Sequence, residues 1–416
     1  MKQFRLALVV FASALGLVRA QDDQQSRQPP TEIPDFSNLD EYTYEPKSTL
    51  MFGLRRLSGA KMQFSGKGLL AAPEAATDAT SINILRSYHD GAVSPDARVA
   101  ARVDINGNPV IDSSGNQVFD LIAPDGKTNT WSYSDARQLT ADGYLAFHTY
   151  SAAINDPTVR NKQANSANGV DVAVSRDMGK LFGTRASWSI IAGVTISDLA
   201  ASRSDKVQAQ LNALTDLYSL DGQVLPALPY SAPSSSTATV TDSLGNAVLN
   251  SDGSTQSAST DTTVLLNNKP IDRQTKTATD STSVSNRWKV KGAYLTLRAG
   301  PAVWVPLTSK FRAMVSAGPA VIYSGSSYSV SQSFQPELGA EISDTTVSEQ
   351  NKFLPGYFAD ASLQFDLTEH SGFFAGAVFQ SAGSYTQTVT STAANYATKI
   401  DFANQNGLRA GMTIRF

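Results

Sequence analysis

The chain closes on the sequence GLRAGMTIRF (residues 407–416), and this stretch decides the fold class. Its apolar side chains share one parity: Leu408, Ala410, Met412, Ile414 and Phe416. The other parity carries small or polar side chains: Arg409, Gly411, Thr413 and Arg415. A period of two over nine residues predicts a β-strand with one apolar face. If that face packs against other protein, the strand belongs to a soluble sheet. If it contacts lipid, the strand belongs to a membrane barrel.

Composition narrows the function classes. The chain has 416 residues, 41% of them hydrophobic, a formal charge of -3 and no cysteine. A charge this close to neutrality does not favour nucleic acid as a partner. The lack of cysteine excludes disulfides, a thiol nucleophile and a Cys-ligated metal site.

The first 48 residues predict export. Residues 1–20 have a charged start, an apolar stretch from Leu6 to Val18 and a small-residue cleavage site, which is typical of a signal peptide. Residues 21–48 are polar and contain prolines, so we expect a flexible periplasmic leader. Residues 49–416 would form the folded part, in which no apolar run reaches the 18 residues of a membrane helix.

Alternation recurs along the rest of the chain. The clearest example is Arg185–Asp198, preceded by the alternating Val170, Val172 and Val174. Two more pairs of alternating segments, 293–303 with 311–323 and 357–367 with 373–379, are joined by tight turns. The faces opposite the apolar ones carry mostly Ser, Thr, Gly and Ala, which suits a narrow interior better than open water.

This pattern predicts a transmembrane antiparallel up-and-down β-barrel. Because a charged residue on the lipid face costs about 2 to 4 kcal/mol, the charged parity should line the lumen. We expect the polar lumen network to comprise Asp171, Arg185, Arg298, Arg312, Asp360, Asp366 and Arg409. Since an eight-stranded barrel barely holds its own side chains, these groups should be packed and paired rather than conductive.

Connection lengths predict the topology. Tight turns belong on the periplasmic side, and the long stretches 67–167, 199–285, 326–352 and 388–400 outside. Counting strands gives about eight. Ten strands are the alternative, because GYLAFHTYSA (143–152) also has the pattern of a strand. This segment either pairs with another loop strand such as NQVFDLIA (116–123) or, with that partner, enlarges the barrel to ten strands.

The chain end resembles the C-terminal assembly signal of bacterial outer-membrane barrels. Arg409, Gly411, Ile414 and Phe416 occupy its polar, glycine, apolar and terminal aromatic positions. The resemblance implies export to the periplasm, insertion by the barrel-assembly machinery and residence among the lipids of a Gram-negative outer membrane. Size and topology are similar to small OmpA-type and OmpW-type barrels, except that the first two external loops are much longer.

Candidate chemistry is sparse. His89 and Asp90, in the first external loop, allow a Ser-His-Asp arrangement, but no nucleophile elbow supports it. VDINGNPVIDSSGN (103–116) superficially resembles a calcium loop, yet Gly115 stands where a bidentate Glu is needed, so an EF-hand is excluded. The apolar, Pro-rich part of the second long loop favours a self-packed cap over disorder. We expect no metal, no cofactor and no catalytic residues.

These observations favour a monomeric outer-membrane barrel with a structural or surface-recognition role that is not catalytic. A narrow diffusion channel for small solutes is the first alternative. A lipid-modifying enzyme at the barrel rim is the second. An external ligand bound by the long loops is a further partner consistent with this role.

Overall fold

A computed structural model describes residues 47–71, 78–82, 84–232, 235–239, 247, 257–261, 263–391 and 393–416. The expected signal peptide, 1–20, lies outside these residues. So does the expected leader, 21–48, except for its last two positions. Strand structure begins at Ser48, one residue before the predicted start of the folded part.

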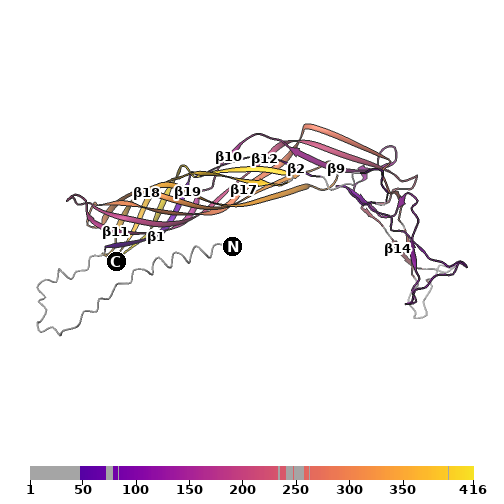
Figure 1. The fold of residues 1–416 in the computed structure, drawn as a ribbon, viewed down its shortest axis with the longest axis horizontal. Helices are drawn as coiled ribbons and strands as arrows, with labels where there is room; N and C mark the ends of the chain where they lie inside the picture. Colours follow the sequence, from indigo (N-terminus) through magenta and orange to yellow (C-terminus); the bar gives the residue numbers. More distant parts are fainter. Residues whose placement is uncertain are drawn as a thin grey trace. The chain divides into compact units, whose positions relative to one another are not determined.

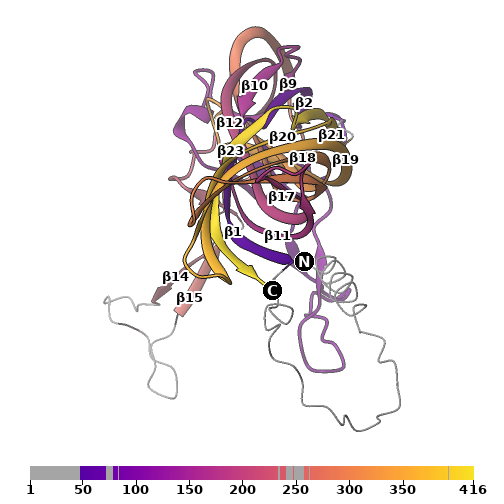
Figure 2. The same ribbon diagram turned by 90° about the vertical axis from the view of Figure 1, so that its left-hand side faces the viewer.

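Eight antiparallel strands form a closed ring, as Figures 1 and 2 show. Each strand pairs with its two neighbours, and the pairing of β11 with β12 closes the circle. In ring order the strands are β11 (Ala167–Lys180), β1 (Ser48–Ser58), β23 (Gln405–Arg415), β20 (Ser371–Ala382), β19 (Ile342–Asp366), β18 (Phe311–Phe334), β17 (Asp272–Pro306) and β12 (Ser187–Ser219). The predicted eight-stranded up-and-down barrel is confirmed.

Three short connections, 181–186, 307–310 and 367–370, lie at one end of the barrel, which we call the short-turn end. The first strand begins there and the last strand ends there, because Ser48 and Phe416 exchange two backbone hydrogen bonds of 3.0 Å. The C-terminal strand therefore pairs with the first strand, as closure of a meander requires.

The extra strand in the first long connection does not enlarge the ring. β9 (Tyr144–Ile154) pairs with the distal part of β12 and with the tip of β2 (Lys61–Leu70). Residues 116–123 are not its partner, because β6 (Phe119–Leu121) pairs with β5 (Val99–Ala101) instead. The ten-stranded alternative is therefore wrong.

The strands run further than the sequence predicted. β12 and β17 contain 33 and 35 residues, so much of 199–285 is strand rather than loop, and β18 and β19 take up most of 326–352. Four shorter strands prolong other walls in the same direction: β2, β10 (Arg160–Gln163), β21 (Ser384–Thr390) and β22 (Ala394–Asp401). The barrel thus continues well beyond its apolar wall.

Residues 59 and 60 interrupt the alternation between β1 and β2, so even-numbered side chains point outward in β1 and inward in β2. Gly59 has φ +109°, a conformation that favours glycine, and an added Cβ would meet the carbonyl oxygen of Asn404. Leu54, before the interruption, is 68% exposed, whereas Met62, of the same parity, is fully buried. Parity counted continuously from Leu50 to Phe64 therefore does not predict which of these side chains point inward.

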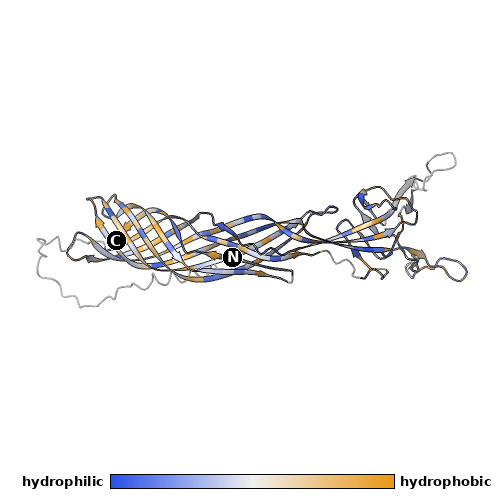
Figure 3. Ribbon diagram, turned by 90° about the horizontal axis from the view of Figure 1, so that it is seen from above, coloured by the Kyte–Doolittle hydropathy of each residue, from blue (hydrophilic) through white to orange (hydrophobic). Residues whose placement is uncertain are grey.

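The two halves of the long strands have opposite solvation patterns. On β17 near the short-turn end, Leu297 points outward and is exposed while Arg298 is buried inside. Farther along the same strand, Trp288 is buried inside and Lys291 is exposed. In Figure 3 the hydrophobic segments are conspicuous on the wall of the half that carries the C-terminus.

Candidate functional site

The carboxylate of Asp171 lies at the centre of the barrel lumen. Arg298, on β17, donates to its two oxygens at 2.7 and 2.9 Å, and Arg409, on β23, donates to Oδ2 at 3.2 Å. All three side chains are almost completely buried. Two-pronged contact between a guanidinium and a carboxylate fixes both groups geometrically, so this pairing ties three separate strands together.

Small and aromatic neighbours shape the space around the guanidinium groups. Gly193 faces inward beside Arg298, and an added Cβ would lie 3.2 Å from its Cζ. The Arg298 guanidinium lies over the ring of Phe358 at 5.8 Å, and that of Arg409 over Phe374 at 5.1 Å. A flat cation on the face of an aromatic ring gains electrostatic stabilisation inside a dry cavity.

Further groups extend this lumen network. Asp360 Oδ2 lies 2.7 Å from Nε of Arg409, forming a second buried ion pair. Arg55 donates to Thr195 Oγ1 at 3.2 Å and to Gln380 Oε1 at 2.7 Å, both neutral acceptors. Thr195 in turn donates to Asp171 at 2.5 Å. Side chains from β1, β11, β12, β17, β19, β20 and β23 thus form a continuous connection across the lumen.

A second polar cluster lies at the short-turn end. Asp366 forms ion pairs with two arginines. Its Oδ2 lies 3.1 Å from Nε of Arg312, and its Oδ1 contacts Arg415. Arg312 also lies 4.8 Å from the centre of the Trp304 ring, whose Nε1 donates to Ser189 Oγ at 2.9 Å. Trp304 is therefore an inward-facing residue at this end of the lumen.

The structure brings together six of the seven residues predicted to form the lumen network, but as two clusters. Asp171, Arg298, Asp360 and Arg409 form the central one, and Arg312 and Asp366 belong to the second. The prediction for Arg185 was wrong. It lies in the exposed connection 181–186, because β12 begins only at Ser187 and the alternation was extended two residues too far.

Sequence reasoning missed several inward residues: Arg55, Thr195, Gln380, Gln405 and Arg415. Arg415 has the same parity as Arg409, so alternation alone could have identified it. Arg55 shares its parity with the inward Met51 and Gly53, a signal hidden by the face reversal at Gly59.

Aromatic side chains fill the lumen farther from the short turns. The ring of Phe64 stacks on Trp288 and Tyr328 with centroids 6.2 and 6.1 Å away. Tyr385 Oη lies 2.7 Å from Ser326 Oγ, and both are buried. The interior therefore changes along the barrel axis from ion pairs to packed rings.

The first and second long connections pack together into a unit that we call the cap. Trp131 Nε1 donates to the carbonyl of Val264 at 2.6 Å, and Arg86 to that of Asn268 at 3.1 Å. The cap core comprises Tyr88, Val93, Trp131, Tyr133, Leu145, Phe147, Tyr218, Leu220, Tyr230, Ala232 and Leu266. In these described parts the loops are folded on one another around apolar residues.

A buried carboxylate anchors the cap on the long strands. Asp216, on β12, is fully buried and accepts two hydrogen bonds of 2.7 Å from Arg273 on β17. Tyr88 donates to the same carboxylate at 2.6 Å, and its hydroxyl lies 2.8 Å from that of Tyr218. Burial raises the pKa of Tyr88, so the phenol stays protonated and remains a donor.

The histidines of the cap are arranged differently from the prediction. Asp90 contacts His148 rather than His89: its Oδ2 lies 2.6 Å from His148 Nδ1, and its Oδ1 accepts the backbone N–H at 2.8 Å. His89 Nδ1 accepts the backbone N–H of Tyr150 at 3.0 Å. Burial lowers the pKa of His89, which therefore favours the neutral ring that this hydrogen bond requires.

The calcium-like segment forms tight turns. Asp104 accepts the backbone N–H groups of Asn106 and Asn108 at 2.8 Å, and Asp112 accepts those of Ser114 and Asn116 at 2.8 and 2.9 Å. Their carboxylates therefore cap these turns. Among the described residues, no three metal-binding side chains are grouped.

Comparisons with known proteins give limited information. No protein-family model and no curated protein matches the chain. The chain is similar to the solved structure of the outer membrane protease OmpT from Escherichia coli, with 8% identity, 89% of this chain and 97% of that chain covered, and a TM-score of 0.27. It is also similar to a Pseudomonas aeruginosa FadL homologue, with 8% identity, coverage of 89% and 90%, and a TM-score of 0.17. Across the described part of the chain, no helix has the length and apolar character needed to span a membrane.

Proposed function

We propose that the protein is an outer-membrane β-barrel in which a closed barrel anchors a folded cap for recognition at the cell surface, without catalysis. The signal-like start, the exposed apolar wall and the terminal aromatic residue all support this proposal. The wall includes Leu54, Leu297 and Val315, with exposed fractions of 68%, 45% and 60%. Water would solvate such a wall poorly, whereas hydrocarbon tails solvate it well.

The observation that carries the anchoring role is the state of the lumen. Asp171, Arg298 and Arg409 form a cross-lumen set of buried ion pairs, and the rings of Phe64 and Trp288 pack above them. A diffusion channel needs a hydrated path, whereas paired charges and stacked rings hold the interior side chains in place. The narrow-channel alternative therefore has less support than a plug-like anchor.

Assembly follows from the chain end under this proposal. The terminal strand would carry the signal for the barrel-assembly machinery, with Phe416 exposed at the outside of the barrel and Gly411 against the backbone of Phe52. Arg409 would then have two roles, since its side chain also belongs to the lumen network. The remaining partners would be outer-membrane lipids, and the barrel would be monomeric.

Three measurements test this function, two on the purified protein and one on intact cells. Heat-modifiable gel migration should show a shift only after boiling, as expected for a folded barrel. Planar bilayers containing the protein should stay silent, and proteases added to intact cells should cleave within the cap. Steady single-channel openings would instead establish the channel, and a cap protected from external protease would refute the surface role.

One observation favours a second candidate, a hydrolase at the barrel rim. The contact between Asp90 and His148 Nδ1 orients an imidazole as in a catalytic dyad. Hydrolysis of ester and peptide substrates by the purified protein should then be lost in His148→Gln and retained in His370→Gln, since His370 is in an exposed turn. Equal activities in these two variants, or none in the wild type, would leave the dyad as a structural pair.

A further inference from the structure

A group of basic side chains lies on the outer face of β17, directly beyond the apolar wall. Going away from the short-turn end, the outward residues of this strand change from Leu297, Leu295 and Ala293 to Lys291, Lys289 and Arg287. We call the last three the basic stripe. Same-face residues on a strand are about 7 Å apart, so the three charges extend over about 13 Å.

The register of the sheet shows that the stripe starts where the apolar wall ends. Ala293 lies between Asp198 on β12 and Gly325 on β18, and Gly325 is paired with Asn351 on β19. This row contains no bulky apolar side chain, whereas the row that pairs Leu295 with Tyr323 and Phe353 still does. The basic stripe therefore begins in the first row past the edge of the wall.

Neutral hydroxyl groups flank Lys289 and Arg287 on both sides, whereas Lys291 lies between Ala200 on β12 and Ser327 on β18. Lys289 pairs with Ser202 and Ser329, and Arg287 pairs with Ser204 and Ser331. The charge of Lys291, with smaller contributions from burial and from the charge of Arg287, lowers the pKa of Lys289, as expected for crowded like charges. Such crowding is relieved when an anion binds.

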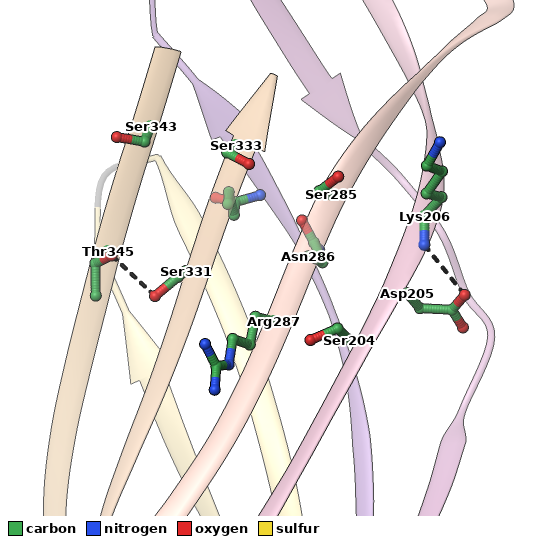
Figure 4. Close-up of a pocket in the computed structure, with 11 residues that line it drawn as sticks. Ser204, Asp205, Lys206, Ser285, Asn286, Arg287, Ser331, Ser333, Ser343 and Thr345 are labelled. Carbon is green, nitrogen blue, oxygen red and sulfur yellow. Dashed lines mark hydrogen bonds between the residues drawn. The ribbon is translucent and has the colours of Figure 1, made fainter. Parts of the chain in front are cut away.

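A groove of about 490 Å³ adjoins the far end of the stripe. Figure 4 shows the residues that line it. Its lining includes Arg287 and Lys206 together with serine and threonine hydroxyls from β12, β17, β18 and β19. Asp205 also lines it, but this carboxylate is already paired with Arg160 at 2.9 Å and Arg203 at 3.3 Å. Positive charge and hydroxyl groups thus dominate what a ligand in the groove would meet.

We propose that the basic stripe and the adjoining groove bind the headgroup of a phosphorylated glycolipid in the outer leaflet. This inference rests on the proposed membrane location, which places the edge of the apolar wall at the level of lipid headgroups. Phosphates pair with Lys291, Lys289 and the guanidinium of Arg287, while sugar hydroxyls meet the serine-rich groove. Acyl chains of the same lipid lie against Leu295 and Leu297, so one molecule contacts both regions.

Purified full-length protein in detergent micelles provides the test, with bisphosphorylated lipid A as the probe. The same lipid without its phosphates, phosphatidylglycerol and inorganic phosphate serve as comparison ligands. The combined change Arg287→Gln, Lys289→Gln and Lys291→Gln should weaken lipid A binding by about a hundredfold, since each basic residue near an anionic surface contributes about a factor of five. Added salt should reduce the difference.

The matched control carries Lys61→Gln, Lys162→Gln and Lys399→Gln, an equal charge change on a different wall formed by β2, β10 and β22. Its lipid A affinity should stay within about threefold of the wild type. Equal loss in both triple variants, or unchanged binding in the stripe variant, would overturn the site. Equally tight binding of phosphatidylglycerol would overturn the glycolipid assignment, and full competition by inorganic phosphate would assign the stripe to a soluble anion.

Heat-modifiable migration of every variant separates this inference from the proposed function. A boiled-only shift in the stripe variant together with the loss of lipid A binding supports both. The same shift with unchanged lipid A binding refutes the site alone, while the absence of a shift in the wild type refutes the barrel anchor itself.

Discussion

The two halves of β17 contrast sharply although they belong to one uninterrupted strand. Near the short-turn end, Arg298 is buried inside and Leu297 is exposed outside. Beyond Ala293, Val290 and Trp288 are buried inside while Lys291 is exposed. The backbone pairing with β12 is continuous through both halves, so the strand register does not account for the inversion.

The difference teaches that the solvent around each half selects its side chains. An apolar exterior around a polar interior is stable where hydrocarbon surrounds the barrel, and the reverse arrangement is stable where water does. The row of Asp198, Ala293, Gly325 and Asn351 marks the change from one arrangement to the other. The same kind of substitution should therefore have different effects on the two sides of this row.

The largest effect is expected in the polar half of the lumen. Asp171→Asn removes the carboxylate that pairs with Arg298 and Arg409 and leaves both cations buried, which should lower the free energy of unfolding by about 3 to 5 kcal/mol. Urea unfolding in lipid vesicles measures the change. Asp120→Asn, which breaks only the exposed pair with Arg102, should not change it measurably. Equal stability of these two variants would contradict a structural role for the lumen network.

The packed half of the lumen should be sensitive to a different kind of change. Phe64→Ala removes the ring between Trp288 and Tyr328 and should cost about 3 to 4 kcal/mol through lost contacts and a residual cavity. Phe64→Leu retains part of the volume and should cost less. If urea unfolding gives Phe64→Ala the same free energy of unfolding as the wild type, within error, then the ring does not stabilise the packed half of the lumen.

Outward substitutions test the boundary row directly. Leu297→Arg places a charge on the apolar wall and should cost about 2 to 4 kcal/mol in a bilayer. Ser329→Arg places the same charge outward on the other side of the row and should change stability by less than about 0.5 kcal/mol. Vesicle unfolding experiments that give similar values for both would show that the two faces share one solvent.

The sequence predicted the half of the barrel that lipid would surround better than the half beyond it. Apolar alternation identified the segments around Val194, Leu297 and Phe365, because an outward aliphatic face against a small inward face is a strong period-two signal. Beyond Asp198 the outward residues become Ser and Lys, and these strands resembled loops. The partner of β9 depended on contacts with β12 more than 50 residues away, which local periodicity does not contain.

The candidate site was also predicted only in part, because local periodicity gives the face of a side chain but not its distant partners. Parity placed Asp171, Arg298 and Arg409 inside, but their arrangement around one carboxylate depends on which strands face one another across the lumen. The contact between Asp90 and His148 joins residues that lie 58 positions apart in the sequence, so His89, the residue adjacent to Asp90, was the wrong partner.

The smallest expected effect concerns pH and the cap. Burial lowers the pKa of His89 below its ordinary value near 6.5, so the unfolded cap binds a proton more readily than the folded one. The stabilisation from the neutral ring is complete above about pH 6.5 and decreases as the pH falls toward the lower folded-state pKa. Protease cleavage of the cap should therefore accelerate between pH 7.5 and 5, and less so in His89→Gln. Identical pH profiles for the two proteins would exclude His89 as a source of the effect.

The most direct test of the two-solvent account is spin-label accessibility in lipid vesicles. The chain has no cysteine, so Leu297→Cys and Lys289→Cys each provide a single labelling position. We expect the label at position 297 to be relaxed by oxygen, which partitions into hydrocarbon, and the label at 289 by a water-soluble nickel chelate. Equal relaxation of both labels by the nickel chelate, or burial of the label at 297 away from both reagents, would contradict a lipid-solvated wall.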